Sequence, residues 1–269
     1  MLDRALVIAL ALPISGVSSS PEPVTTRVTH GQTAWVRTES QHFEIHYLPP
    51  LAGDVARVTR SAELAYDRIS GRLNFTLAAK IPLVMFAPSA GMSQEQVVTY
   101  AISERVAPHH PHRSRIVLPL RDGDAPLDTR MSHELTHLLV GEIILPQAPG
   151  DGGVPRWVHE GIATYLAGGW SDEHQRLMRE LVAAGGVPAL SELTGSGGFT
   201  NARVNEALGH VAFDYIESRW GPTGIRRFID ALIIPRVAKT YDAVFELTPM
   251  EFDAAFRAYA ARRFGSAIR

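Results

Sequence analysis

Apolar and polar residues alternate in short segments of the first half of the chain, and this pattern predicts β-strands. The clearest case places Phe43, Ile45 and Tyr47 between polar neighbours, as expected for a strand with one buried face. Two further segments are apolar and β-branched, and prolines or charged residues bound them. The predicted strands cover residues 43–47, 81–87 and 115–120.

Elsewhere apolar residues recur every three or four positions, which predicts helices packed against a core. The last of these has a clear start, because Thr248 precedes Pro249 and Glu251 follows three residues after the threonine. That arrangement is typical of a capping box. The predicted helices cover residues 51–73, 93–101, 127–141, 156–168, 172–185, 203–219, 222–233 and 249–264.

The order of these elements predicts an α+β fold with two lobes. Strands and helices alternate in a small N-terminal α/β lobe with a mixed sheet, over residues 34–125. After residue 126 strand signals largely vanish, so residues 126–269 form a mainly helical lobe. Residues 20–33 are rich in Ser, Pro and Thr and are expected to be a linker.

The N-terminus is typical of a secretory signal peptide, residues 1–19. An apolar stretch from Ala5 to Val17 leads to Ser18, Ser19 and Ser20, with cleavage expected near the last two. The stretch is too short and interrupted for a stable membrane span. We therefore expect a secreted or periplasmic protein. The alternative is a cytosolic protein with an N-terminal tail.

Composition narrows the function classes. The chain has 269 residues with 45% hydrophobic content, which is enough for a sizeable core. Its net charge of -2 and lack of a basic run argue against nucleic acid as a partner. The absence of cysteine excludes disulfides and cysteine catalysis. The sequence does not indicate an oligomeric state.

Residues 133–137, His-Glu-Leu-Thr-His, carry the strongest chemical signal. Two histidines four residues apart lie on one face of a helix, separated by about 6 Å of axial rise. This spacing lets both imidazoles bind one Zn²⁺, and Glu134 is then placed to act as general base on a metal-activated water. The alternative is two surface histidines with an incidental glutamate.

A catalytic zinc needs a third protein ligand, and Glu160 is the best candidate. Pro155 suits the first turn of a second helix, on which Glu160 shares a face with the small residues Ala163, Thr164 and Ala167. That face can approach the first helix closely. The alternative is that Glu160 is only an early-helix glutamate favoured by the helix dipole, which would leave the third ligand unassigned.

The two segments together resemble the gluzincin metallopeptidases, and most closely the bacterial "peptidase MA-like" group. The resemblance rests on H-E-x-x-H at 133–137 and on Trp-x-x-Glu-Gly-x-Ala-x-Tyr at 157–165. It covers roughly residues 40–265, although only these two helices are specific. It implies a zincin-like fold, with His133, His137 and Glu160 as zinc ligands and Glu134 as the base.

The chain also departs from this pattern. Thermolysin-type enzymes place an aspartate four residues after the third ligand, where this chain has Thr164, so the groups that orient the zinc histidines must differ. Related enzymes stabilise the oxyanion with a Tyr or His from a later helix. The candidates here are His210, Tyr215 and Tyr241, of which we favour His210 as the catalytic donor.

Three functions are compatible with these residues. The preferred one is a zinc-dependent peptidase that acts on a peptide or protein substrate with Glu134 as general base. The second is a catalytically inactive, zinc-stabilised binding or scaffold protein, because no donor motif is obvious. The third is a non-peptide metallohydrolase, because the same site can hydrolyse another amide or an ester.

Overall fold

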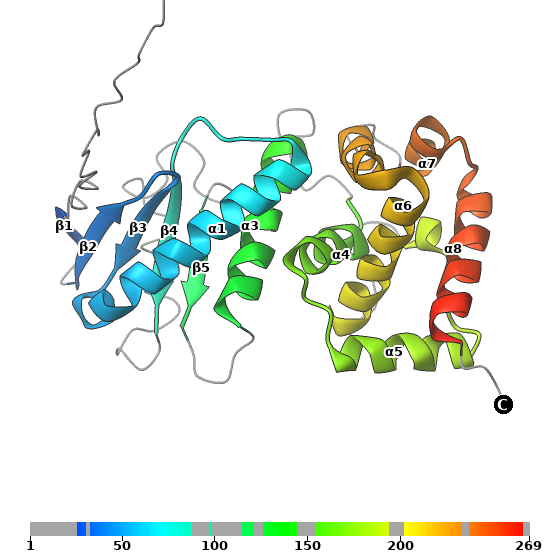
Figure 1. The fold of residues 1–269 in the computed structure, drawn as a ribbon, viewed down its shortest axis with the longest axis horizontal. Coiled ribbons are helices and arrows are strands. Elements are labelled where there is room, and N and C mark those ends of the chain that lie inside the picture. Colours follow the sequence, from blue (N-terminus) through cyan, green and yellow to red (C-terminus); the bar gives the residue numbers. More distant parts are fainter. Residues whose placement is uncertain are drawn as a thin grey trace, which may run out of the picture.

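The structure is a computed structural model that describes residues 26–30, 33–87, 97, 115–120, 126–144, 154–193, 202–232 and 237–265. The sheet with α1 and α3 lies at one end of the molecule, and α4 to α8 lie at the other (Figure 1). The strands are β1 (Thr26–His30), β2 (Thr33–Glu39), β3 (Phe43–Tyr47), β4 (Ile81–Phe86) and β5 (Ile116–Pro119). The helices are η1 (Pro49–Asp54), α1 (Val55–Leu73), α3 (Leu127–Ile144), α4 (Arg156–Ala167), α5 (Asp172–Ala183), η3 (Leu190–Glu192), α6 (Ala202–Ala231), α7 (Val237–Phe245) and α8 (Pro249–Phe264).

The five strands form one mixed sheet in the order β1-β2-β3-β4-β5. β1, β2 and β3 pair antiparallel, whereas β3, β4 and β5 pair parallel. The three predicted strands are confirmed as β3, β4 and β5. The sheet also contains β1 and β2, which the alternation pattern did not predict, and β1 lies within the predicted linker 20–33. That prediction is therefore wrong for residues 26–30, where the backbone pairs with β2.

The two faces of the sheet belong to different apolar clusters. Phe43, Ile45, Leu83 and Met85 point to the face that α1 and α3 cover, and none of the four is exposed. Trp35, Val84 and Phe86 point to the opposite face, in a smaller cluster that includes Val97. Both faces of β4 are therefore buried, as its continuous apolar sequence requires.

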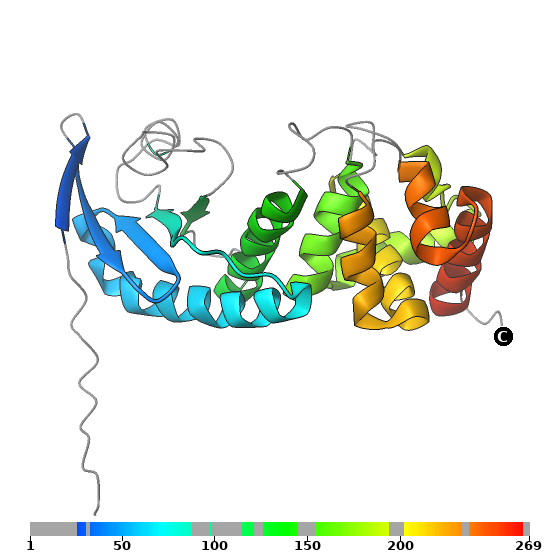
Figure 2. The same cartoon turned by 90° about the horizontal axis from the view of Figure 1, so that it is seen from above.

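α1 runs along the covered face of the sheet and on toward the helical lobe (Figure 2). Val58, Ala62, Ile69 and Leu73 form its buried stripe. The helix ends at Asn74, whose φ of 45° is the left-handed conformation that asparagine tolerates well. The predicted helix 51–73 is confirmed, except that its first turn belongs to η1.

The helical lobe follows the predicted helices, with differences at α3, α6 and α7. α3 continues past Gly141 to Ile144. The two helices predicted on either side of Gly221 form α6, which bends there because Gly221 has a φ of 71°. α7 was not predicted. α8 begins with the predicted capping box, since Thr248 and Glu251 bond reciprocally. The predicted helix 93–101 lies, except for Val97, outside the described residues.

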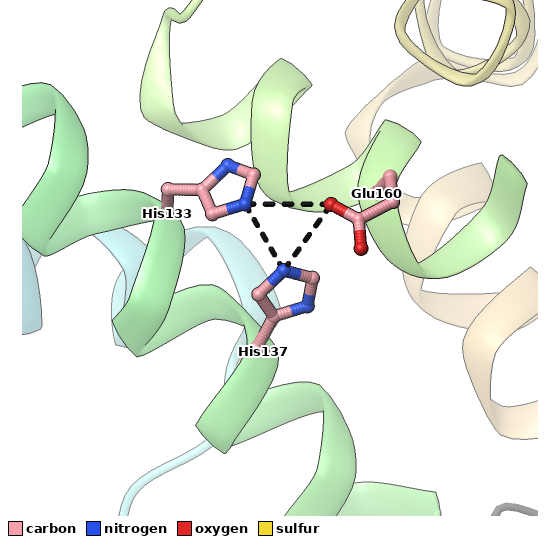
Figure 3. A group of neighbouring side chains, drawn as sticks. All are labelled: His133, His137 and Glu160. Carbon is pink, nitrogen blue, oxygen red and sulfur yellow. Dashed lines mark hydrogen bonds and ion pairs between the residues drawn. The ribbon is translucent and has the colours of Figure 1, made fainter. Parts of the chain in front are cut away.

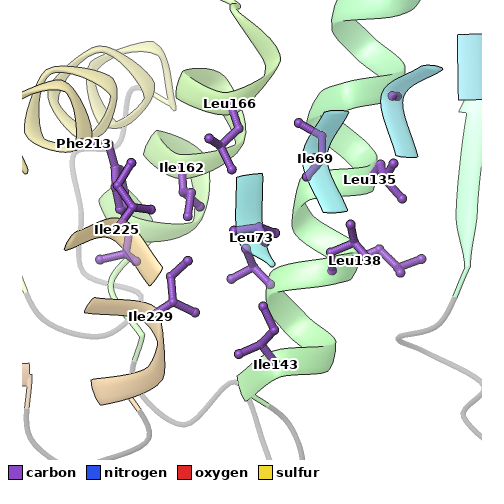
Figure 4. Packing of buried hydrophobic residues seen from close by; sticks show 14 of the residues in the cluster. Ile69, Leu73, Leu135, Leu138, Ile143, Ile162, Leu166, Phe213, Ile225 and Ile229 are labelled. Carbon is purple, nitrogen blue, oxygen red and sulfur yellow. The ribbon is translucent and has the colours of Figure 1, made fainter. Parts of the chain in front are cut away.

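One apolar cluster joins the two lobes (Figure 4). It contains Ile69 and Leu73 of α1 and continues through α3 and α4 to Phe213 and Ile229 of α6. α3 thus packs between α1 and α4. The fold is α+β, with a mixed sheet in the N-terminal part and a helical C-terminal part, as the sequence predicted. Among the helices of the described ranges, none combines the length and apolarity that crossing a membrane requires.

Candidate metal centre

The structure brings together the three predicted metal ligands. His133 and His137 project from α3 toward Glu160 on α4, so the group forms where two helices lie side by side (Figure 3). The two Nε2 atoms are 3.0 Å apart. Glu160 Oε2 lies 3.6 Å from His133 Nε2 and 3.7 Å from His137 Nε2. Among the residues that the structure describes, these three are the group of metal-binding side chains whose ligand atoms lie close enough together to hold one ion.

These distances fit a shared cation. Ligand atoms about 2.1 Å from a tetrahedral Zn²⁺ lie about 3.4 Å from one another. The three separations of 3.0, 3.6 and 3.7 Å bracket that value. The side chains of His133, His137 and Glu160 are 25%, 28% and 27% exposed, so a water and a substrate can reach an ion held there.

Charge around the cluster is arranged for a cation. His133 and His137, whose Nε2 atoms lie 3.6 and 3.7 Å from its carboxylate, hold the pKa of Glu160 well below its usual range and outweigh the opposing effect of burial. Burial lowers the pKa of His133, yet the adjacent Glu160 carboxylate and the charges of Glu134 and Glu206 raise it overall. The carboxylates that attract a proton to His133 would also attract a metal ion.

α3 holds the two histidines on a helix that is fixed to the rest of the N-terminal lobe. Met131, Leu135 and Leu139 are fully buried on its opposite side. Near its start, Ser61 of α1 donates to Asp128 over 2.5 Å. Arg68 of α1 donates to Ser132 over 2.5 Å, one residue before His133. The direction in which His133 points is therefore set by both apolar packing and polar contacts to α1.

Arg130 connects the same helix to the sheet. Its guanidinium donates to the backbone carbonyl of Pro119 at the end of β5. Local sequence patterns do not indicate this contact, because the two residues belong to different elements. It places the last residue of β5 next to the first turn of α3.

α4 positions Glu160 through well-defined ends and a deeply buried face. Pro155 caps its start in an extended conformation, and Gly168 ends it with a φ of 68°. Trp157, Val158 and Ile162 are fully buried. The predicted helix 156–168 is confirmed to within one residue, so Glu160 sits in its second turn.

Glu134 is exposed on α3, next in sequence to His133. Its charge contributes to the raised pKa of His133. An exposed carboxylate beside the cluster is accessible to solvent and substrate. The position is thus compatible with the predicted base.

His210 is not part of the cluster. It lies on α6, is only 9% exposed, and packs against the rings of Tyr165 and Trp170 at centroid distances of 5.1 and 4.7 Å. Its Nδ1 is buried and has no hydrogen-bond partner among the residues that the structure describes. Burial lowers the pKa of His210 to about 4. The structure thus places it against Tyr165 of α4 and the following Trp170, outside the three-ligand cluster, and its role as donor stays a prediction.

The two alternative donors are also in the helical core. Tyr215 is 6% exposed and packs against Trp220 and Phe252. Tyr241 has no exposed surface, and burial raises the pKa of its hydroxyl far above the usual range. The Tyr241 hydroxyl is buried, so it cannot contact a substrate in this conformation. Local patterns suggested them because a helical tyrosine looks the same in sequence whether it faces the core or a cleft.

Glu206 is a charged neighbour that the sequence analysis missed. It accepts from Arg203 over 2.9 Å, and its Oε2 lies 3.0 Å from Nε2 of the buried His174. Its charge also contributes to the raised pKa of His133. It stands 46 positions after Glu160 on another helix, so no local motif could have connected it to the metal ligands.

No family model and no curated protein matches this chain. Three of the solved structures that it is similar to are M1 zinc metallopeptidases. One is from Deinococcus radiodurans, at 14% identity and a TM-score of 0.45. The others are two-domain enzyme variants. The one bound to L-tryptophan matches at 13% identity and a TM-score of 0.44, and the one bound to L-arginine at 12% identity and a TM-score of 0.41. Each match covers 89% of this chain and 51% of the other, so this chain spans about half the length of those proteins.

Proposed function

We propose that this protein is a zinc-dependent peptidase whose metal is held by His133, His137 and Glu160. The observation that carries the proposal is the convergence of two imidazole nitrogens and one carboxylate oxygen at separations of 3.0, 3.6 and 3.7 Å. Two nitrogen ligands and one oxygen ligand suit zinc, and three protein ligands leave one coordination position for chemistry.

The chain's own residues supply the proton transfers. Zinc, when bound, supplies a Lewis acid that polarises a carbonyl and lowers the pKa of a water towards about 7. Glu134 takes a proton from the water whose oxygen forms the new bond to the scissile carbonyl carbon. The same carboxyl then passes that proton to the amine as the carbon–nitrogen bond breaks. We assign no step to His210.

The edge of β5 supports a limited mode of substrate pairing. Leu120 N–H donates to the Phe86 carbonyl over 2.6 Å, so Leu120 faces β4 and, by alternation, Val117 and Pro119 face the other edge. Proline has no N–H, and the Pro119 carbonyl already accepts from Arg130. Val117 is thus the residue of β5 that presents both backbone groups to this edge. This favours a short substrate contact over a long β-ladder.

Metal content tests the ligand assignment. We expect one zinc per chain after metal loading of the purified protein. His137→Ala and Glu160→Gln should lose most of that zinc, because each removes one of three ligands. Glu180→Gln is a matched control, since this glutamate is exposed on α5, where it pairs with Arg176 at 3.8 Å. Absence of zinc from the wild type would refute the proposal.

Replacement of Glu134 separates the candidate functions. Glu134→Gln keeps the shape of the side chain, so it should retain one zinc but lose cleavage of a peptide library by at least about 100-fold. Near wild-type cleavage by this variant would exclude the mechanism. A wild type that binds zinc and is stabilised by it, but cuts no peptide, would favour the scaffold function. The observation that supports the scaffold function is the burial of His210, Tyr215 and Tyr241, the three candidate oxyanion donors.

A further inference from the structure

The backbones of α4 and α6 touch at two glycines. A Cβ atom added to Gly161 would lie 2.3 Å from the Cα of Gly209 and 2.4 Å from its carbonyl carbon. A Cβ atom added to Gly209 would lie 2.1 Å from the Trp157 carbonyl oxygen and 2.4 Å from the Cα of Gly161. Both obstacles are backbone atoms, which cannot rotate away. Only glycine at both positions allows the helices to approach this closely.

This contact involves the residue next to the third ligand. Gly161 follows Glu160 in the sequence, and adjacent residues of a helix point about 100° apart. Gly161 therefore faces α6 while Glu160 faces the histidines of α3, as Figure 3 shows for the carboxylate. α4 is held between α3 and α6, with Trp157, Val158 and Ile162 fully buried around the contact. The distance between α4 and α6 therefore determines how far Glu160 extends toward α3.

A methyl group at Gly209 would displace the two helices by much more than metal–ligand distances can vary. Ordinary contacts of a Cβ atom begin near 3.4 Å, so a methyl group at Gly209 requires a shift of about 1 Å between the helices. Metal–ligand distances vary by only about 0.2 Å around their preferred values. Protein interiors are close-packed, so a rigid helix transmits such a shift to its other face.

We propose that Gly209, through its contact with Gly161, is a positioning residue for the metal ligand Glu160. Gly209 touches neither metal nor substrate, and acts by fixing the position of the α4 backbone. The inference rests on the proposed metal site. It extends the set of residues that determine metal affinity to a helix that supplies no ligand.

Zinc affinity of Gly209→Ala tests the inference, measured by competition with a chromophoric chelator on protein shown to be folded by circular dichroism. We expect affinity to fall by about 10-fold or more, the range seen when groups that orient a metal ligand are lost. Gly161→Ala introduces the same conflict from the other helix and should behave alike. Either variant suffices if the other does not fold, and sucrose can restore folding in a marginal case.

Two controls separate positioning from general destabilisation. Gly71→Ala changes a helical glycine of α1 whose added Cβ would meet nothing within 4 Å. Phe256→Leu destabilises the apolar core where α8 packs, because Phe256 is fully buried there. Both should keep the wild-type zinc affinity within about twofold, because neither moves α4.

A double-mutant cycle provides the readout that a merely structural role would not change. If α4 shifts relative to α3, shortening the ligand with Glu160→Asp should have a different effect on zinc affinity in Gly209→Ala than in the wild type. With Gly71→Ala the two effects should multiply. Wild-type zinc affinity in folded Gly209→Ala would overturn the positioning role while leaving the metal site intact. A wild type without zinc would instead refute the proposed function.

Discussion

Burial lowers the pKa of His210 below that of an ordinary histidine. The ring lies between Tyr165 and Trp170, and burial lowers its pKa to about 4 although the charge of Asp214 opposes this effect. The folded protein therefore keeps His210 neutral at pH values where the unfolded chain, with a pKa near 6.5, already binds a proton. Above pH 6.5 His210 is neutral in both states, and its full contribution to the free energy of unfolding is present. That contribution is lost progressively as the pH falls toward about 4.

We expect the His210 ring to titrate near pH 4 in an NMR titration of the folded, metal-free protein. The unfolding free energy of the wild type should fall between pH 6.5 and pH 4, by up to about 3 kcal/mol from this residue. His210→Phe keeps an aromatic ring among Tyr165 and Trp170 but cannot titrate, so it should lose less stability over the same range. A His210 pKa near 6.5 would contradict the buried position.

At the scale of elements, the ends of helices show how closely local sequence can specify structure. α8 begins where Thr248 accepts from the Glu251 N–H and the Glu251 carboxylate accepts from the Thr248 N–H. Thr248→Ala removes the hydroxyl that binds one otherwise unpaired N–H. It should lower the unfolding free energy by about 1 kcal/mol in a denaturant titration. Thr76→Ala, at an exposed position outside any helix, should change stability little; an equal loss there would contradict the cap's contribution.

The elements that the sequence did not reveal depend on distant partners. β1 and β2 form a hairpin at the edge of the sheet, where the segment's Ser, Pro and Thr content favoured a linker. α7 is short, and its buried Tyr241, Val244 and Phe245 carry a helical spacing too brief to separate from a loop. In contrast, α1, α3, α4 and α8 have long stripes or clear ends. Propensity and periodicity act locally, so they specify such helices but not the strands that pairing stabilises.

The same distinction applies to the candidate site. His133 and His137 are one helical turn apart, so their convergence follows from the geometry of one helix. Glu160 required a second helix with an identifiable start and a small-residue face. Whether His210 and Tyr241 face a cleft or the core depends on how α6, α7 and α8 pack, which periodicity does not specify. The Gly161–Gly209 contact likewise exists only after α4 and α6 have met.

At the scale of the whole molecule, polar contacts reinforce the apolar cluster that joins the lobes. Arg226 of α6 donates to the backbone carbonyls of Leu73 and Asn74 at the end of α1, over 2.5 and 2.9 Å. Arg72 of α1 donates to Glu217 of α6 over 2.7 Å, and Glu217 also accepts from the Tyr165 hydroxyl of α4. These contacts join the C-terminal end of α1 to the helix that carries Glu160. We infer that the two lobes unfold together, because neither buries its share of the common cluster alone.

Zinc removal tests this coupling, because the proposed ligands belong to α3 and α4, on the two sides of the junction. A ligand that binds only the folded state at 100 times its dissociation constant stabilises it by about 2.7 kcal/mol. Chelation should therefore lower Tm by about 5–10 °C for a chain of this size, in one calorimetric transition. Hydrogen exchange should show the slowest amides of β3 and of α4 losing the same protection, since both open only in global unfolding. If chelation weakened protection in α4 while leaving β3 unchanged, the metal would stabilise the helical lobe alone and the lobes would be independent folding units.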